Sequence, residues 1–120
     1  MQQTMEQRRA AHAWRKAQEG VQQHGKDYVN DAKGLPALIM NSGLMQVMAF
    51  LEGKGGRHET LAAHLRDWLH QVQGTPVGFE PFMQHLLKAE PREFQAITAE
   101  SFAWLRWLRQ MAPAVKKGGS

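Results

Sequence analysis

The longest uncharged stretch of the chain, residues 34–51 (GLPALIMNSGLMQVMAFL), limits what this sequence can fold into. A bilayer-spanning helix needs roughly 20 mostly apolar residues, and this stretch is shorter and is interrupted by Pro36, Asn41 and Gly43. We therefore expect a soluble protein without a membrane span. Because a proline at the first position of a helix loses no hydrogen bond, we expect one helix over 36–52.

The apolar residues of this expected helix do not share one face. Leu38 and Met45 lie on a different side from Ile39 and Phe50, and a helix that is apolar almost all round is buried on most sides. The simplest interpretation is a central core helix. The alternative is a methionine-lined contact patch, since methionine adapts to irregular partner surfaces. Both hold if one side faces the core and the other a neighbouring subunit.

The rest of the sequence also has a helical pattern, because no stretch alternates apolar and polar residues for long enough to make a strand. Thr4 is the expected N-cap of the first helix and Gly25 its stop, and Pro113 is expected to end the last helix. The helices are expected over 4–24, one or two turns within 26–34, 36–52, 57–72, 80–88 and 91–111. The predicted fold is all-α: a single compact bundle of five to six helices with irregular or orthogonal packing, over 1–112, followed by a flexible basic tail, 113–120.

Positive charge is concentrated at the two ends of the chain. The net charge is +2 over residues 1–20, −2 over residues 21–100 and +4 over residues 101–120, where no acidic residue occurs. Such an asymmetry allows contact with nucleic acid, although many basic proteins bind none.

The first helix carries two rows of basic residues. Arg8 and Arg15 are seven residues apart, as are Arg9 and Lys16, and such a ribbon can follow a phosphate backbone. An ordinary solvated face is the alternative. The rows lie opposite the apolar stripe, which is expected to comprise Ala10, Ala13, Trp14, Ala17 and Val21.

In the last helix, Trp104 is expected to anchor the core. Trp107 stands at the edge beside Arg106 and Arg109, where it could equally pack in the core or stack on single-stranded nucleic acid. In the helix over 57–72, Arg66 and His70 are expected to face away from the apolar side.

The sequence gives little support for catalysis. It has no cysteine, and His58, His64 and His70 are six residues apart, which is not the helical spacing of a zinc pair. His64 is most simply a satisfied, semi-buried imidazole. No nucleophile elbow or phosphate-binding loop is present. We therefore expect no metal, no cofactor and no small-molecule substrate; a nuclease is the weakest alternative.

Three segments resemble the small subunit of the type III-B CRISPR effector, the Cmr complex. The central match consists of Leu35 to Ile39, the pair Gly43-Leu44, and Ala49 to Leu51 with Lys54. Glu100 and Trp107-Leu108-Arg109 match that family's closing helix, and the arginines of the first helix followed by Tyr28 are also similar. One departure is Ser42, where the family often has asparagine before the central glycine. The resemblance extends over nearly the whole chain.

This resemblance implies an all-α, non-catalytic, cytoplasmic subunit in antiviral defence. Its partners would be other Cmr subunits, neighbouring copies of itself, and the guide RNA paired with its target, with cleavage by the backbone subunit. We expect contact with the RNA backbone without base readout. The alternative is a protein–protein adaptor that touches no nucleic acid. The candidate phosphate contacts are Arg8, Arg9, Arg15, Lys16, Lys54 and Arg57, then Arg106 and Arg109.

Overall fold

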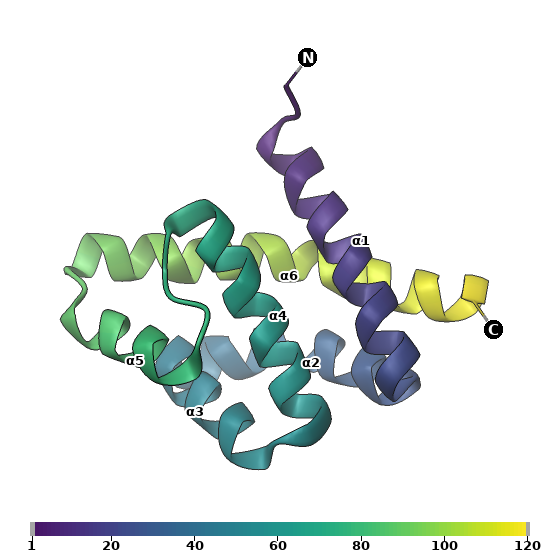
Figure 1. The fold of residues 1–120 in the computed structure, drawn as a ribbon, viewed down its shortest axis with the longest axis horizontal. Coiled ribbons are helices and arrows are strands. Elements are labelled where there is room, and N and C mark those ends of the chain that lie inside the picture. The colour runs from purple at the N-terminus through teal and green to yellow at the C-terminus, as the bar shows by residue number, and fades with distance from the viewer. Residues whose placement is uncertain (1, 120) are drawn as a thin grey trace.

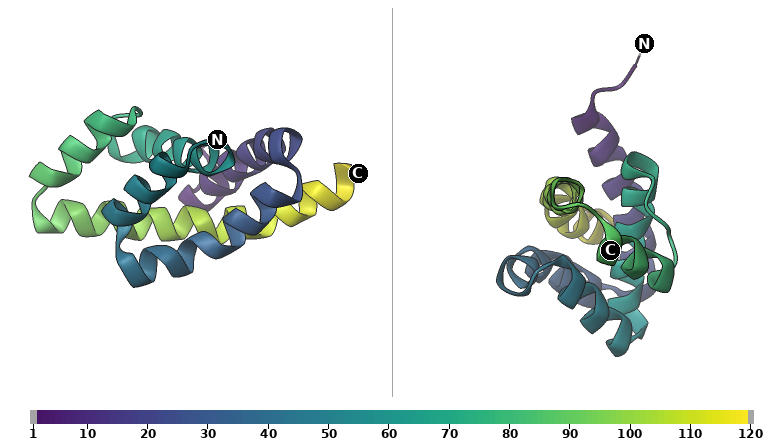
Figure 2. Two further views of the ribbon diagram at one scale, coloured as in Figure 1. Left: turned by 90° about the horizontal axis from the view of Figure 1, so that it is seen from below. Right: turned by 90° about the vertical axis from the view of Figure 1, so that its left-hand side faces the viewer.

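The computed structural model describes residues 2–119 and consists of helices joined by short turns and one longer loop (Figure 1). The expectation of an all-α bundle is confirmed. Helix α6 runs along the longest axis of the molecule, and α1, α2 and α4 pack against it at different angles (Figures 1 and 2). The helices are α1 (Met5–His24), α2 (Lys26–Ser42), α3 (Leu44–Lys54), α4 (Gly56–Gln73), α5 (Phe79–Lys88) and α6 (Pro91–Gly119).

The two ends of α1 are set by local signals that the sequence shows. Thr4 and Gln7 form a capping box, in which the Gln7 backbone N–H donates to Thr4 Oγ1 at 3.1 Å and the Thr4 backbone N–H donates to Gln7 Oε1 at 2.8 Å. Gly25 ends the helix with a φ of 59°, a conformation that glycine adopts without a steric cost. The predicted cap and stop are both confirmed.

The uncharged stretch forms parts of two helices, so the prediction of one helix over 36–52 is wrong. Gly43 separates α2 from α3 with φ 83° and ψ 156°, a region of backbone space open essentially to glycine alone. The expected burial on most sides is also wrong, because Leu38, Met40 and Phe50 are 42%, 76% and 50% exposed. The stretch therefore has an inner side and an outer apolar side.

Pro91 begins α6 as expected, but Pro36 and Pro113, which were also expected at helix boundaries, lie inside helices. Helix α2 begins ten residues before Pro36. An internal proline costs about 3 kcal/mol, and the packing of α2 on its neighbours offsets this. Pro113 likewise does not end α6, which continues to Gly119. The carbonyl that Pro113 leaves without a donor belongs to the exposed residue Arg109, where water can bond it. The side chains of α2 that bury its inner face are Tyr28, Val29, Ala32, Leu35 and Ile39.

The core contains two fully buried tryptophans, Trp68 of α4 and Trp104 of α6, and the prediction for Trp104 is confirmed. Tyr28 is also fully buried, and it lies directly against Gly20 of α1. A Cβ atom built on Gly20 would be 2.3 Å from the tyrosine ring. Gly20 thus allows α1 to approach α2, which explains a glycine inside an otherwise regular helix.

The predicted stripe on α1 is wrong at one position. Trp14 is 41% exposed, whereas His12 is 1% exposed. Apart from His12, the buried residues of α1 are the small Ala13, Ala17 and Gly20, so the helix lies close to its neighbours and the larger indole remains at the edge. Arg66 was expected to face away from the core but is 4% exposed. Within residues 2–119, no helix is both long and apolar enough to span a membrane.

Candidate nucleic-acid interface

Arg9, one of the eight candidate phosphate contacts, is held by two carboxylates. Its Nε and Nη2 donate to the two oxygens of Glu100 at 2.7 and 2.8 Å, and its Nη1 donates to Glu6 Oε1 at 2.7 Å. The hydrogen bonds from Arg9 to Glu100 and Glu6 raise the pKa of the guanidinium above its usual value. The charge of Arg9 is therefore neutralised within the fold, which argues against its predicted role in binding phosphate.

Glu100 is the centre of a network that joins three helices. Besides Arg9 of α1, it accepts a hydrogen bond from the indole N–H of Trp68 in α4 at 3.0 Å. Burial by itself would raise the pKa of Glu100, but the hydrogen bonds from Arg9 and Trp68 outweigh it and hold the pKa below its usual value. Glu6 extends the network, because it accepts the indole N–H of Trp107 at 3.1 Å. The network thus fixes α1 against α4 and α6.

Two further candidates also meet carboxylates. Lys16 Nζ lies 3.4 Å from Glu19 Oε1 and 3.9 Å from Asp67 Oδ2. Arg57 of α4 is paired with two aspartates of α2, its Nη1 with Asp27 at 3.0 Å and its Nε with Asp31 at 3.2 Å. Lys16 and Arg57 are thus already partnered, and a phosphate would have to compete with these carboxylates for them.

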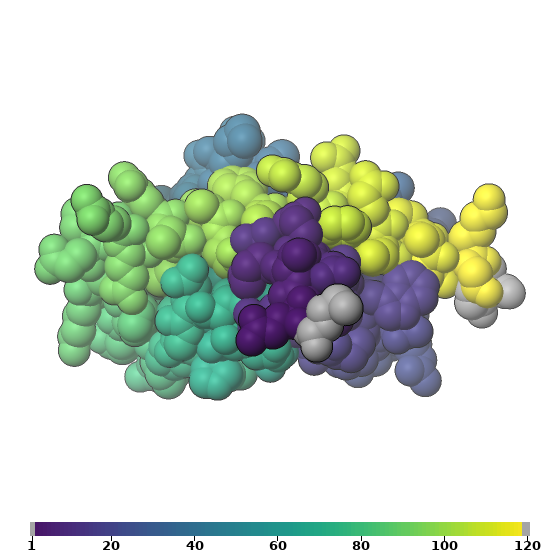
Figure 3. All heavy atoms as spheres, turned by 90° about the horizontal axis from the view of Figure 1, so that it is seen from above, coloured from purple at the N-terminus to yellow at the C-terminus, as the bar shows by residue number. Residues whose placement is uncertain are grey.

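Arg8 and Arg15 differ, because both are exposed and neither forms an ion pair with any residue between 2 and 119. The guanidinium of Arg8 lies over the Trp68 ring, 6.0 Å from its centroid, which restrains its position. Both arginines line a mostly polar hollow of about 130 Å³ between α1 and α4, which we call the arginine hollow. The start of α1 lies on the surface between α4 and α6 (Figure 3). The other residues that line the hollow are Gln3, Ala11, His12, Trp68 and Gln71.

The remaining three candidates are exposed but lie elsewhere. Lys54 is at the turn between α3 and α4, with its Nζ 5.6 Å from the Phe50 ring centroid. Arg106 and Arg109 are on α6. The α3–α4 turn and the start of α1 are on opposite sides of the molecule (Figures 1 and 2). The structure therefore does not bring the eight residues together in one surface.

His12 lies beneath the arginine hollow with both ring nitrogens engaged. The Trp104 indole N–H donates to Nδ1 at 2.9 Å, and Nε2 lies 2.7 Å from Asp67 Oδ2. Because an indole can only donate, Nδ1 carries no proton and Nε2–H donates to Asp67. Burial lowers the pKa of His12 despite its contact with Asp67. In this arrangement His12 is an internal bridge, without a free nitrogen for proton transfer to a ligand.

His64, which was predicted to be semi-buried and hydrogen-bonded, is buried, and its Nδ1 is 2.8 Å from the Tyr28 hydroxyl. Its Nε2 is 3.5 Å from Glu19 Oε1, and burial lowers its pKa to about 4. The imidazole is therefore neutral at physiological pH. No group of three or more His, Asp or Glu side chains within the described part of the chain is placed to hold a metal ion.

Sequence reasoning missed the buried polar residues that lie beneath the arginine hollow. His12 meets Trp104 and Asp67 across separations of 92 and 55 residues, which no local pattern shows. Arg66 was wrongly predicted to face away from the core for the same reason. Its partner lies outside its own helix, since its Nε donates to the carbonyl of Val77 at 2.7 Å in the loop after α4.

Comparisons with known proteins agree with this fold. A family model described as "CRISPR-associated protein (Cas_Cmr5)" matches residues 5–115. The crystal structure of a CRISPR-associated Cmr5 family protein from Thermus thermophilus matches with a TM-score of 0.79 and 27% sequence identity, over 95% of this chain and 98% of that chain. The comparison with curated proteins gives no match. Since the family model extends over nearly the whole chain, this protein belongs to the Cmr5 family of CRISPR-associated proteins.

Proposed function

We propose that this chain is a non-catalytic small subunit of a type III-B CRISPR ribonucleoprotein that acts in antiviral defence in the cytoplasm. It packs beside the larger backbone subunit and neighbouring copies of itself, and cleavage of the target RNA is performed by another subunit. The family match supports membership of such a complex. The occupied ring nitrogens of His12 support the absence of acid–base chemistry at the arginine hollow.

The subunit contacts the guide–target RNA backbone through Arg8 and Arg15. The observation that carries this proposal is their exposure without carboxylate partners, next to Arg9 and Lys16, which are paired. Double-stranded RNA is recognised mostly by shape and phosphate contacts, which unpaired arginines provide. Lys54, Arg106 and Arg109 are exposed and contribute further contacts outside this hollow.

The test compares reconstituted complexes containing the wild-type chain, the double variant Arg8→Ala/Arg15→Ala, or the control Arg92→Ala. The control removes an exposed cation near the start of α6. RNA affinity is measured over a salt series. Each lost phosphate contact reduces the slope of log K against log salt by about 1, so the double variant should lower it by about 2. Equal slopes for all three proteins would contradict the proposal.

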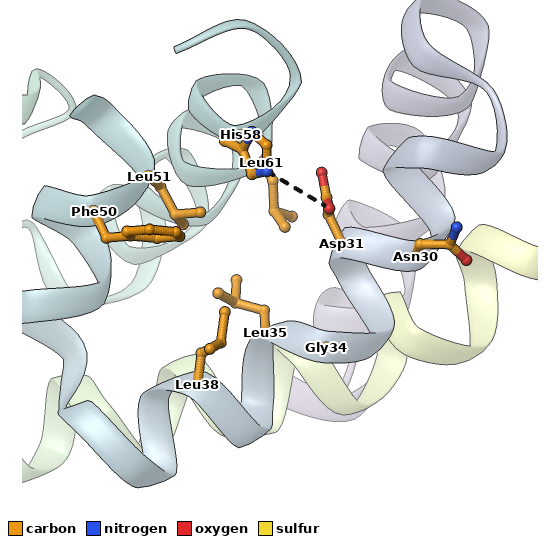
Figure 4. Close-up of a pocket in the computed structure, with 9 residues that line it drawn as sticks. All are labelled: Asn30, Asp31, Gly34, Leu35, Leu38, Phe50, Leu51, His58 and Leu61. Atoms are coloured by element: carbon orange, nitrogen blue, oxygen red, sulfur yellow. Dashed lines mark ion pairs between the residues drawn. The ribbon is translucent and has the colours of Figure 1, made fainter. Parts of the chain in front are cut away.

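A second candidate function is a protein–protein adaptor, which the exposed apolar side of α2 and α3 favours. Leu38 of α2 and Phe50 of α3, which are 42% and 50% exposed, line a hollow of about 130 Å³ together with the buried side chains of Leu35 and Leu51 (Figure 4). Single exposed apolar residues are common, but a cluster of them points to an interaction site. This surface could serve assembly with or without RNA contact by α1.

The adaptor function is tested by Phe50→Ala, with Leu87→Ala as the control because Leu87 is also exposed, at 64%, but on α5. For an adaptor, only Phe50→Ala should reduce co-purification of the other complex subunits. A pure adaptor also requires that RNA does not crosslink to the chain near Arg8 or Arg15. Crosslinks at these arginines would favour the first function.

A further inference from the structure

Trp14 is the largest side chain of α1 that the fold leaves uncovered. It is 41% exposed, and its indole N–H has no hydrogen-bond partner among residues 2–119. The other three tryptophans all donate their indole N–H to a protein acceptor, namely Glu100, His12 or Glu6. An aromatic face and a free donor at the surface are what a planar ligand with hydrogen-bonding edges requires.

A hollow adjoins this ring. Trp14 and Gln18 of α1 line it on one side, and the last turns of α6 line it on the other with Ala114, Val115 and Gly118. Its volume is about 330 Å³, near the lower end of the range for small-molecule sites. Gln18 lies one helical turn after Trp14 on the same face, so an amide is available beside the ring. The hollow exists because α6 continues past Pro113.

The surroundings of this hollow favour an anionic ligand. The stretch 101–119 of α6 contains no acidic residue, and Glu19, which follows Gln18, lies 3.4 Å from Lys16 Nζ and 3.5 Å from His64 Nε2. Arg15 follows Trp14 directly, and because successive helical positions are about 100° apart, it projects toward the neighbouring arginine hollow. A ligand lying across α1 could therefore place a planar ring on Trp14 and a negative group at Arg15.

We propose that Trp14 and Gln18, with Arg15, form a site for one unpaired nucleotide of single-stranded RNA, whose base stacks on the indole while its phosphate meets the guanidinium. The inference rests on the proposed RNA contact of α1 and extends it, since phosphate binding alone does not separate single strands from duplexes. Stacking of a base on an aromatic ring tolerates any base, so the site is selective for strandedness and not for sequence.

The test uses the full-length chain with two labelled probes of equal length, an oligouridylate and a perfectly paired RNA duplex. Binding is followed by fluorescence anisotropy for the wild type, Trp14→Ala, Trp14→Phe, Arg15→Ala and the control Leu87→Ala. Loss of one stacked base weakens binding roughly tenfold. We expect this loss for Trp14→Ala with oligouridylate only, and near-normal binding for Trp14→Phe, which keeps an aromatic face. Arg15→Ala should weaken binding of both probes.

The outcomes separate this proposal from the proposed function. If Arg15→Ala weakens duplex binding but Trp14→Ala leaves oligouridylate binding unchanged, the stacking site is wrong and the phosphate contact stands. Equal losses of both probes in Trp14→Ala would also overturn the stacking site. If Trp14→Ala alters only co-purification with other complex subunits, the hollow takes a protein. If the wild type binds neither probe at low salt, both proposals fail.

Discussion

Replacing Gly20 with alanine tests how α1 is held against α2. In an exposed helix this change stabilises by about 1 kcal/mol, since alanine is the better helix former. Here the new Cβ would lie 2.3 Å from the Tyr28 ring, which is fully buried and is bonded through its hydroxyl to His64 at 2.8 Å. The ring cannot yield without losing that contact, so the sign of the effect should reverse.

The magnitude follows from three contributions. Overpacking a well-packed core costs about 1–3 kcal/mol, and weakening the buried Tyr28–His64 hydrogen bond costs about 1 kcal/mol more. The gain in helix propensity offsets about 1 kcal/mol. We therefore expect Gly20→Ala to lower the free energy of unfolding by about 2 kcal/mol, which corresponds to a fall in Tm of about 8 °C for a domain of this size.

The assay is urea unfolding followed by circular dichroism, with Gly34→Ala as the matched control. Gly34 lies inside α2, and a Cβ built there would meet nothing within 4 Å, so this change should be neutral or slightly stabilising. A double variant with Tyr28→Leu should make Gly20→Ala less costly, because it removes the ring. If Gly20→Ala is as stable as Gly34→Ala, the packing argument is refuted.

Three further predictions concern stability. The folded pKa of His64, about 4, lies below the unfolded value, so the unfolded state binds more protons between about pH 4 and 6.5. Unfolding measured at several pH values should therefore show that the free energy of unfolding falls by about 3 kcal/mol as the pH is lowered from about 6.5 to 4. Glu100→Gln should cost about 3 kcal/mol in urea unfolding, because Arg9 loses a buried partner; an unchanged midpoint would show that the pair contributes nothing. Gly43→Ala should cost about 1–3 kcal/mol through backbone strain at φ 83°, and a thermal scan that matches wild type would contradict this.

Local signals predicted much of the fold. The capping box at Thr4 and the positive φ of Gly25 depend on residues within one turn, so the bounds of α1 could be read from the sequence. The all-α class followed from helical periodicity in the same way. The positions of Pro36 and Pro113 were predicted wrongly because tertiary packing decides whether a helix continues through a proline. Pro36 stays inside α2 since that helix buries its inner face on several neighbours.

The candidate site was harder to predict, because charge alone does not show which cations are free. Arg8 and Arg9 are adjacent in sequence, yet Arg9 reaches Glu100, 91 residues away, and Arg8 does not. The sequence identified the basic rows of α1 but could not separate the neutralised row from the open one. Trp14 illustrates the same limit, since only the path of α6 shows which side of α1 is covered.

The hydrogen bond from Trp104 to His12 has a practical consequence. Since the indole fixes which imidazole nitrogen bears the proton, the two ring nitrogens of His12 should give well-separated nitrogen resonances in a nuclear magnetic resonance spectrum. The ring also lines the floor of the hollow beside Arg8 and Arg15. Binding of an anion in this hollow should therefore shift the nitrogen resonances of His12, which allows binding to be followed without an added label.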